Sequence, residues 1–529
     1  MTFRLRAFRA LVLLGGFYLL GVGLLAGMAV LDWLLLTRLF TAGAAWFEGT
    51  VVMATLLAAV TILRGMAAFL RAGRLRPVRG SVAVTPEDQP ELWEQVRAAA
   101  EATGERPPDE LYLDADVNAG VAEHSRLLGL VAGRRRMVLG LPLLAGLTVP
   151  QLRAVLAHEF GHYGNLDTRL GSVTMRGREA VLHTVDAFGE GGTRLQYVIG
   201  SVYVGYARMF LRSSQSVARH QELAADQVSA RHAGRDATAS ALRALPVLNA
   251  AHSHYVETYA GMGRALGALP AAGEVHGGFL RMLDARPGER LAALSAGQRP
   301  PRPHRYDSHP PTAERVALIE ALPADEAAGP GRGEEAAART LLRDPDRVFA
   351  ELEAHTLPPE AATLRRMSWD DLVMARALAD AEGWSRPLRL AVARALRAEG
   401  DTPASAPRRG PAEEVGDAEL PGLEEVLDAF DRGLLWMAVA DRIPKSERAS
   451  RLVGESARNF VRPKVFDAVA GLVHLRLAAA GVATADIAWS GRPGLALPEE
   501  WEKGMDDAID SAVADAPDTT ALRALLARV

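Results

Sequence analysis

The stretch Ala157-His158-Glu159-Phe160-Gly161-His162 places two histidines four residues apart, with a glutamate next to the first. A helix is predicted around it, from Val149 to Tyr163, because Thr148 and Gln151 have the spacing of a capping box. One helical turn separates the two histidines, so their imidazoles share a face on which two neutral ring nitrogens can hold one zinc ion. Glu159 then points at the space beside that ion, where it can act as a base toward water.

A second motif downstream adds acidic groups to this site. Residues Ser216 to Asp226 continue a stretch rich in Ala, Gln and Leu, which predicts a helix. Glu222 and Asp226 are one turn apart, so a carboxylate ligand and a second carboxylate behind it share a face. Because the chain has no cysteine, thiolate ligands are excluded and zinc must be held by histidine and carboxylate.

These motifs resemble those of peptidase family M48, which includes the HtpX-like membrane proteases and the CAAX prenyl proteases. Further segments agree with the family pattern: Asn118-Ala119, Val138 to Leu147, Arg219 three residues before Glu222, and Ser308 to Arg315. Gly120 departs from the pattern, because the family usually has an aromatic residue at that point. The resemblance covers residues 80 to 325. It implies a mainly α fold with an α+β catalytic core that contains a small sheet.

The resemblance also implies how the central residues act. His158, His162 and Glu222 are expected to be the ligands of one zinc ion per chain, and they leave a fourth coordination position open for catalysis. Glu159 is expected to be the general base, which takes a proton from water and passes it to the leaving amine.

Four further residues are candidates around the metal. Asp226 and Asp167 can each orient a ligand imidazole, although a plain helix-end role is an open alternative for Asp167. Arg219 is either solvated or neutralises a carboxylate of the site. His309 precedes a helix predicted from Thr312 to Leu322, and the matching family histidine lies near the zinc, where it can stabilise an oxyanion. A helix-capping role is the alternative for His309.

The segment before the zinc helix predicts a helix that opens at Thr85 and ends near Gly104, followed by a strand from Glu110 to Asp114. A second strand is predicted near Met137 to Gly140. In the resembled family that strand is a sheet edge along which the substrate backbone lies, although a buried strand fits the sequence equally well. The candidate residues of this substrate strand are Asn118, Val138, Leu139 and Gly140.

Two apolar runs near the N-terminus predict a membrane anchor within residues 1–79. Ala10 to Leu31 carries no charge and is long enough, as a helix of about 33 Å, to cross a bilayer. Ala44 to Leu63 is expected to be a second span. A signal peptide is the rival interpretation of the first run, but the run is longer than the apolar part of such a peptide.

Positive residues set the expected orientation. Arg4, Arg6 and Arg9 precede the first run and five arginines end or follow the second, whereas Arg38 alone lies between them. Both ends of the anchor are therefore expected on the cytoplasmic side of the cell membrane, which places the catalytic domain in the cytoplasm. The run from Leu195 to Leu211 is interpreted as an amphipathic helix, with a third span as the alternative.

The C-terminal region, 326–529, is expected to be helical, with linkers near 327–333 and 399–416. It carries no recognisable chemistry and is a candidate for binding a protein partner. A net charge of only −4, from 60 basic and 64 acidic residues, gives no support for nucleic-acid binding.

The sequence as a whole predicts a membrane-anchored zinc metalloendopeptidase that hydrolyses proteins or peptides at the cytoplasmic face of the membrane. Two alternatives stay open. A CAAX-type processing protease is disfavoured, because the resemblance implies several more spans for that group. A membrane scaffold with a vestigial zinc site is disfavoured by the intact ligand set and by Glu159.

Overall fold

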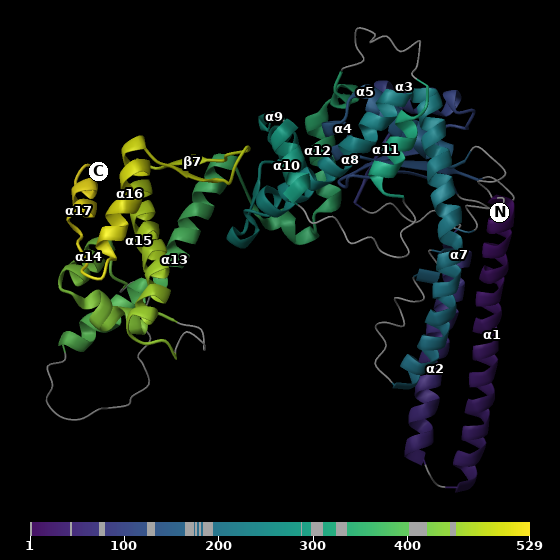
Figure 1. Cartoon of the computed structure of the whole chain (residues 1–529), viewed down its shortest axis with the longest axis horizontal. Coiled ribbons are helices and arrows are strands. Elements are labelled where there is room, and N and C mark those ends of the chain that lie inside the picture. Colours follow the sequence, from purple (N-terminus) through teal and green to yellow (C-terminus); the bar gives the residue numbers. More distant parts are fainter. Residues whose placement is uncertain are drawn as a thin grey trace. The chain divides into compact units, whose positions relative to one another are not determined.

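The computed structural model describes residues 3–42, 45–72, 80–123, 133–163, 174, 177–178, 181–182, 194–286, 288–297, 310–323, 336–400, 420–444 and 451–529. The chain divides into two compact units, Met1–Tyr255 with His276–Pro358, and Val256–Val275 with Pro359–Val529. Both units are mainly helical, as the sequence predicts, with small sheets between the helices (Figure 1).

A four-stranded sheet belongs to the first unit. Its strands are β1 (Val82–Val84), β2 (Glu110–Asp114), β3 (Ala119–Glu123) and β4 (Arg135–Gly140), in the order β1-β2-β4-β3. Alternate residues of β2 and β4 are fully buried on one face, as the two-residue period of a strand requires. They are Leu111, Leu113, Met137 and Leu139.

The pairing of β4 corrects one prediction. Val138, Leu139 and Gly140 do not lie on a sheet edge, because β4 pairs in parallel with β2 and antiparallel with β3. The edge next to β4 is β3, which begins directly after Asn118.

Helices surround the sheet in the first unit. They are α3 (Pro90–Ala102), α4 (Leu141–Gly146), α5 (Val149–Gly161), α7 (Arg194–Ala233), α8 (Arg235–Tyr255), α9 (Glu274–Ala285), α10 (Gly288–Gly297), α11 (Thr312–Glu320) and α12 (Pro345–Thr356). The helix expected to open at Thr85 opens instead at Pro90, because the Thr85 carbonyl accepts the Gln89 N–H and closes a turn first.

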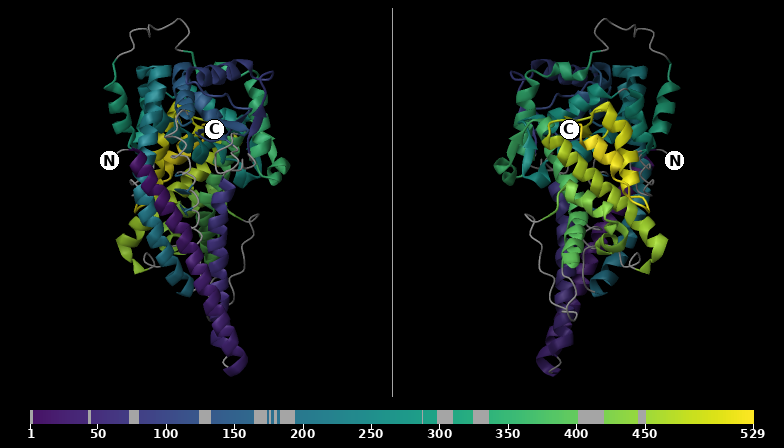
Figure 2. Two further views of the ribbon diagram at one scale, coloured as in Figure 1. Left: turned by 90° about the vertical axis from the view of Figure 1, so that its right-hand side faces the viewer. Right: turned by 90° about the vertical axis from the view of Figure 1, so that its left-hand side faces the viewer.

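Two long helices precede the sheet, α1 (Phe3–Ala42) and α2 (Ala45–Ala72). They lie side by side with the N-terminal half of α7, and Figure 2 shows the same helices from two further sides. The three helices share one apolar core. Its most buried large residues are Leu14, Phe17, Ile62, Phe210 and Leu211. The segment interpreted as an amphipathic helix is therefore the beginning of α7, which continues unbroken for 40 residues.

Within the described residues, one helix is long and apolar enough to cross a membrane, at Leu11–Thr37 of α1. Only 11% of its apolar window is buried, so most of this apolar surface is exposed in the structure. The second expected span has a shorter apolar stretch in the structure, Gly49–Arg64. A two-span anchor stays a prediction.

The first unit extends beyond the expected limit of residue 325. Thr148 forms a β-bridge with Ala337, and Gln89 exchanges two hydrogen bonds with the backbone of Arg343. These contacts hold residues 336–343 against the beginnings of α3 and α5 in the first unit. The predicted linker at 327–333 lies outside the described residues.

The second unit is helical, as expected, and has two two-stranded sheets. Its helices are α13 (Trp369–Gly400), α14 (Leu423–Asp431), α15 (Gly454–Ala479), α16 (Glu499–Ala512) and α17 (Thr520–Leu526). Its strands are β5 (Ala268–Pro270), β6 (Arg365–Met367), β7 (Thr484–Asp486) and β8 (Gly494–Ala496). Most of the linker predicted at 399–416 is outside the described residues, since α13 continues to Gly400.

Candidate metal centre

The helix that carries the two histidines begins where the sequence predicts. The Thr148 hydroxyl accepts the Gln151 N–H, and the Gln151 side chain accepts the Thr148 N–H at 2.9 Å, so the capping box is confirmed. The helix ends at Gly161, and His162 is its C-cap with helical dihedrals. His162 therefore keeps the position one turn after His158, and their ring centroids are 4.8 Å apart.

Helix α7 crosses α5 at a glycine. A Cβ atom on Gly161 would lie 3.1 Å from the Cα of Ala225 and 3.1 Å from the Cβ of Val228, so a side chain there would force its neighbours to shift by a few tenths of an ångström. One turn further, the Ser229 hydroxyl donates a hydrogen bond of 2.8 Å to the Ala154 carbonyl. This close approach brings Glu222 of α7 opposite the two histidines of α5.

Ligand atoms of His158, His162 and Glu222 all lie within 4.8 Å of one another. The Nε2 atoms of both histidines are 3.8 Å from oxygens of the Glu222 carboxylate. Two ligands with bonds of 2.0–2.2 Å to one zinc ion lie roughly 3.3–3.6 Å apart. A small inward movement would thus complete the set, and two imidazoles with one carboxylate are donors that suit zinc.

Asp226 lies behind the ligands and orients one of them. Its Oδ1 is 3.0 Å from Nδ1 of His158, which turns Nε2 of that ring toward Glu222. Arg315 of α11 donates two hydrogen bonds to the same carboxylate, at 2.7 and 2.6 Å. Burial by itself would raise the pKa of Asp226, but the bonds from Arg315 and His158 lower it to about 2. Asp226 is therefore a charged acceptor at neutral pH.

The residue that the sequence reasoning missed is Arg315, whose guanidinium also lies 3.7 Å from Glu222. Arg315 ends the segment Ser308 to Arg315 that agrees with the family pattern, but the sequence predicts no role for it. Arg219, by contrast, is exposed on α7, and within the described chain no bond joins it to a site carboxylate. Of its two alternatives the solvated one fits this position, and the contacts with Glu222 and Asp226 come from Arg315. Asp167 and His309 lie outside the described residues, and their expected roles stay predictions.

Glu159 is half-buried, on the same turn as the ligand histidines. Burial lowers the pKa of Arg315, but its bonds to Asp226 and the nearby charges of Glu222 and Glu159 raise it above its ordinary value. The carboxylate of Glu159 thus lies close enough to act on the Arg315 guanidinium, which contacts Glu222 and Asp226.

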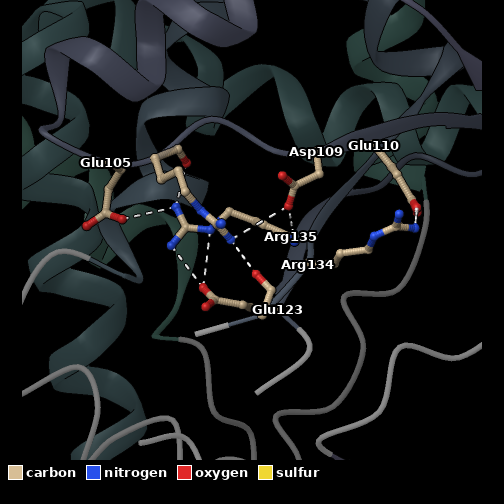
Figure 3. A network of polar contacts seen from close by, with 8 residues as sticks. Glu105, Asp109, Glu110, Glu123, Arg134 and Arg135 are labelled. Carbon is tan, nitrogen blue, oxygen red and sulfur yellow. Dashed lines mark hydrogen bonds and ion pairs between the residues drawn. The ribbon is translucent and has the colours of Figure 1, made fainter. Parts of the chain in front are cut away.

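Tyr163 ties the end of the metal helix to the edge strand. Its hydroxyl donates a hydrogen bond to the Val121 carbonyl of β3, and its ring lies under the Arg135 guanidinium at 4.7 Å. Burial raises the pKa of Tyr163, so the hydroxyl keeps its proton. Figure 3 shows Arg135 held between Glu105 and Glu123, at 3.1 and 3.0 Å. This network fixes β3 next to the ligand histidines.

A cavity of about 660 Å³ lies along the edge strand. Its walls include Asp114, Asp116, Asn118, Gly120, Val138 and Thr356. Gly120 and Val138 are register partners in the β3–β4 pair, so they form the floor on the sheet face opposite to the buried leucines. The structure therefore brings Asn118 and Val138 to one hollow beside β3.

The chain is similar in sequence to a known family of peptidases. Residues 86–322 match the model of peptidase family M48. Protease HtpX of Aliivibrio salmonicida (strain LFI1238) is 31% identical over 196 residues, which cover 32% of this chain and 64% of that protein. Protease HtpX homolog 1 of Saccharolobus solfataricus is 37% identical over 95 residues, 18% of this chain and 29% of that protein. No solved structure matches.

Proposed function

Since residues 86–322 match the model of peptidase family M48, we propose that this chain is a member of that family and a membrane-anchored zinc metalloendopeptidase. The observation that carries the proposal is the convergence of His158, His162 and Glu222, with Glu159 on the same helical turn. The match spans 64% of the length of the first curated relative, so the activity of the whole chain is part of the proposal.

Three protein ligands would hold the ion and leave one position open toward the substrate. A zinc ion bound there supplies a Lewis acid that polarises the scissile carbonyl and makes water more acidic. Glu159 accepts the proton of the attacking water and delivers it to the leaving amine. Asp226, held ionised by Arg315, would keep the proton of the His158 ring on Nδ1 and leave its Nε2, which faces Glu222, free to hold a metal ion. His309 remains a proposed oxyanion donor.

The substrate is proposed to bind as an additional strand on β3. The Tyr163 hydroxyl bonds to the Val121 carbonyl, so the backbone groups of Val121 face away from β4. An extended peptide can pair with such an edge largely independently of its sequence, and its alternate side chains would lie over the cavity next to Asn118. Proteins and peptides are therefore the proposed substrates.

The anchor is proposed to hold the catalytic domain at the cytoplasmic face of the cell membrane. The exposed apolar surface of α1 supports insertion of this helix into a bilayer. The arginines that flank the apolar runs support the proposed orientation. The buried contacts of Leu14 and Phe17 with α7 favour a retained anchor over a cleaved signal peptide. The C-terminal helical unit is kept as a candidate site for a protein partner.

The test compares wild type with Glu159→Gln and Glu222→Ala in detergent, by zinc analysis and by cleavage of an unfolded protein substrate. Wild type is expected to hold about one zinc per chain and to cleave. Glu159→Gln should keep the zinc and lose at least a hundredfold in rate, since it loses only the base. Glu222→Ala should lose the zinc, because two ligands hold it far less well than three.

Two results would refute this assignment. Full zinc occupancy in Glu222→Ala would remove that residue from the ligand set. Cleavage by Glu159→Gln at the wild-type rate, in material free of contaminating protease, would show that this helix does not carry the chemistry.

A further inference from the structure

A second cavity, of about 620 Å³, lies between the start of α1 and the middle of α7. Its lining includes Arg9, Gly205, Arg208, Arg212, Ser213 and Ser216. On α7 the residues at 205, 208, 212 and 216 are three or four positions apart, so they share one face of the helix, and that face is turned toward Arg9. The peptidase chemistry proposed above uses none of these residues.

Among the residues that the structure describes, the lining of this cavity carries three arginines and no carboxylate. In the described part of the chain, none of Arg9, Arg208 and Arg212 has a hydrogen bond or an ion pair. Arg178, which packs nearby against α7, is different: it is buried and donates to the Leu211 carbonyl and to the Ser214 hydroxyl. Three unneutralised guanidinium groups around one cavity repel each other, and a bound anion would remove that repulsion.

The cavity lies at the end of the apolar surface of α1. Arg9 is two residues before the membrane-length stretch Leu11–Thr37. Apolar side chains next to the arginines are exposed, with Phe8 at 63%, Val12 at 55% and Met209 at 44%. Such a border between exposed apolar and cationic side chains corresponds to the level of lipid headgroups when α1 is in a bilayer.

We propose that this cavity binds the phosphate group of an anionic phospholipid. Guanidinium groups bind phosphate oxygens in bidentate fashion, and the hydroxyl of Ser213 can donate a further hydrogen bond, whereas that of Ser216 donates to the Ser213 carbonyl. The exposed Phe8 and Met209 would contact the first carbons of the acyl chains. A lipid bound there bridges α1 and α7, and so links the anchor to the helix that carries Glu222. The proposal rests on insertion of α1 in a membrane and is independent of peptide hydrolysis.

Free phosphate has the same charged group as the lipid but lacks the acyl chains. The experiment therefore uses three probes on the full chain in neutral detergent: phosphatidylglycerol, phosphatidylcholine and inorganic phosphate. Native mass spectrometry counts the lipids retained per chain during a titration, and the melting temperature is recorded with each probe. The variant is Arg208→Gln. The matched control is Arg64→Gln, which removes the same charge from an exposed position on α2 outside the cavity.

Wild type is expected to retain phosphatidylglycerol in preference to phosphatidylcholine, and Arg208→Gln to bind it about fivefold more weakly. Arg64→Gln should bind as wild type does. Equal weakening in both variants would indicate a general effect of surface charge and overturn the site. If millimolar inorganic phosphate raises the melting temperature as much as phosphatidylglycerol does, the cavity binds a soluble anion and the lipid assignment is wrong. Zinc content serves as the folding control in every sample.

Discussion

Helix α7 passes through two different environments without a break. Around Phe210, Leu211 and Val217 its buried face packs against α1 and α2 among apolar side chains. One to two turns later the buried side chains are Glu222 and Asp226, which face imidazole and guanidinium groups. In the first region any apolar group of the right volume can fill the space, whereas in the second each atom has a specific partner. Substitutions should therefore separate stability from metal chemistry along one helix.

The largest effect is expected from Arg315→Ala, in the polar region. It leaves the Asp226 carboxylate buried without its bidentate partner, which should destabilise the fold by about 3–5 kcal/mol. Zinc affinity should fall as well, since His158 loses a firmly held acceptor. Melting temperature and zinc titration measure the two effects. Arg315→Ala combined with Asp226→Asn should recover much of the stability, and failure to do so would mean that Arg315 acts through other contacts.

Phe210→Ala tests the apolar region. Removing a fully buried ring should cost about 3 kcal/mol through lost packing. The zinc content of the molecules that remain folded should stay at the wild-type value. Val202→Ala, at an exposed position on the same helix, is the control and should melt as wild type does. Zinc loss in the folded fraction of Phe210→Ala would show that the two regions of α7 are not separable.

Gly161→Val acts at the crossing that joins the two helices of the metal site. Its side chain would collide with Ala225 and Val228, so we expect a cost of about 1–3 kcal/mol and weaker zinc binding, as Glu222 moves away from the histidines. Gly383→Val is the control for the substitution of a helical glycine by valine, because a Cβ atom on Gly383 would meet no other atom within 4 Å. Unchanged zinc affinity in Gly161→Val would mean that the ligand set tolerates a wider crossing.

The smallest effect is expected from Val121→Pro, which changes neither region of α7. Proline removes an edge N–H that faces away from β4, so zinc content and stability should hold. Pairing with an extended substrate loses one hydrogen bond, and kcat/KM should fall by about threefold to tenfold. The N–H of Ala122 faces β4, so Ala122→Pro should instead lower the melting temperature. If Val121→Pro cleaves as wild type does, substrate does not pair with this edge at that residue.

Local signals were sufficient for the metal helix. The capping box at Thr148 and the four-residue spacing of the histidines depend only on neighbouring residues, and the start of the helix is confirmed. The edge strand could not be identified in the same way. Ala119-Gly120-Val121 carries a weak strand signal, and the order of strands depends on pairings between distant segments, so the sequence does not decide between an edge and a buried position for β4.

Tertiary pairing also explains the other differences. Arg315 is 89 residues from Asp226 in sequence, and no spacing rule connects them. The sequence predicts an amphipathic helix from Leu195 to Leu211 and a helix around Glu222, but it does not show that both belong to one continuous helix, α7. The motif was thus sufficient to predict the cluster of His158, His162 and Glu222, and insufficient to find the cation that holds Asp226 ionised.

The uninterrupted course of α7 also fixes an angular phase between the anchor and the ligand. Each residue of a helix turns the chain by about 100° and advances it by about 1.5 Å. One residue inserted between Val217 and Glu222 would therefore rotate the ligand carboxylate away from the histidines, although the composition of both regions would be unchanged. Seven inserted residues, close to two full turns, would restore its direction but displace it by about 10 Å. The distance from the core shared with α1 and α2 to the Glu222 carboxylate is therefore fixed by the helix itself.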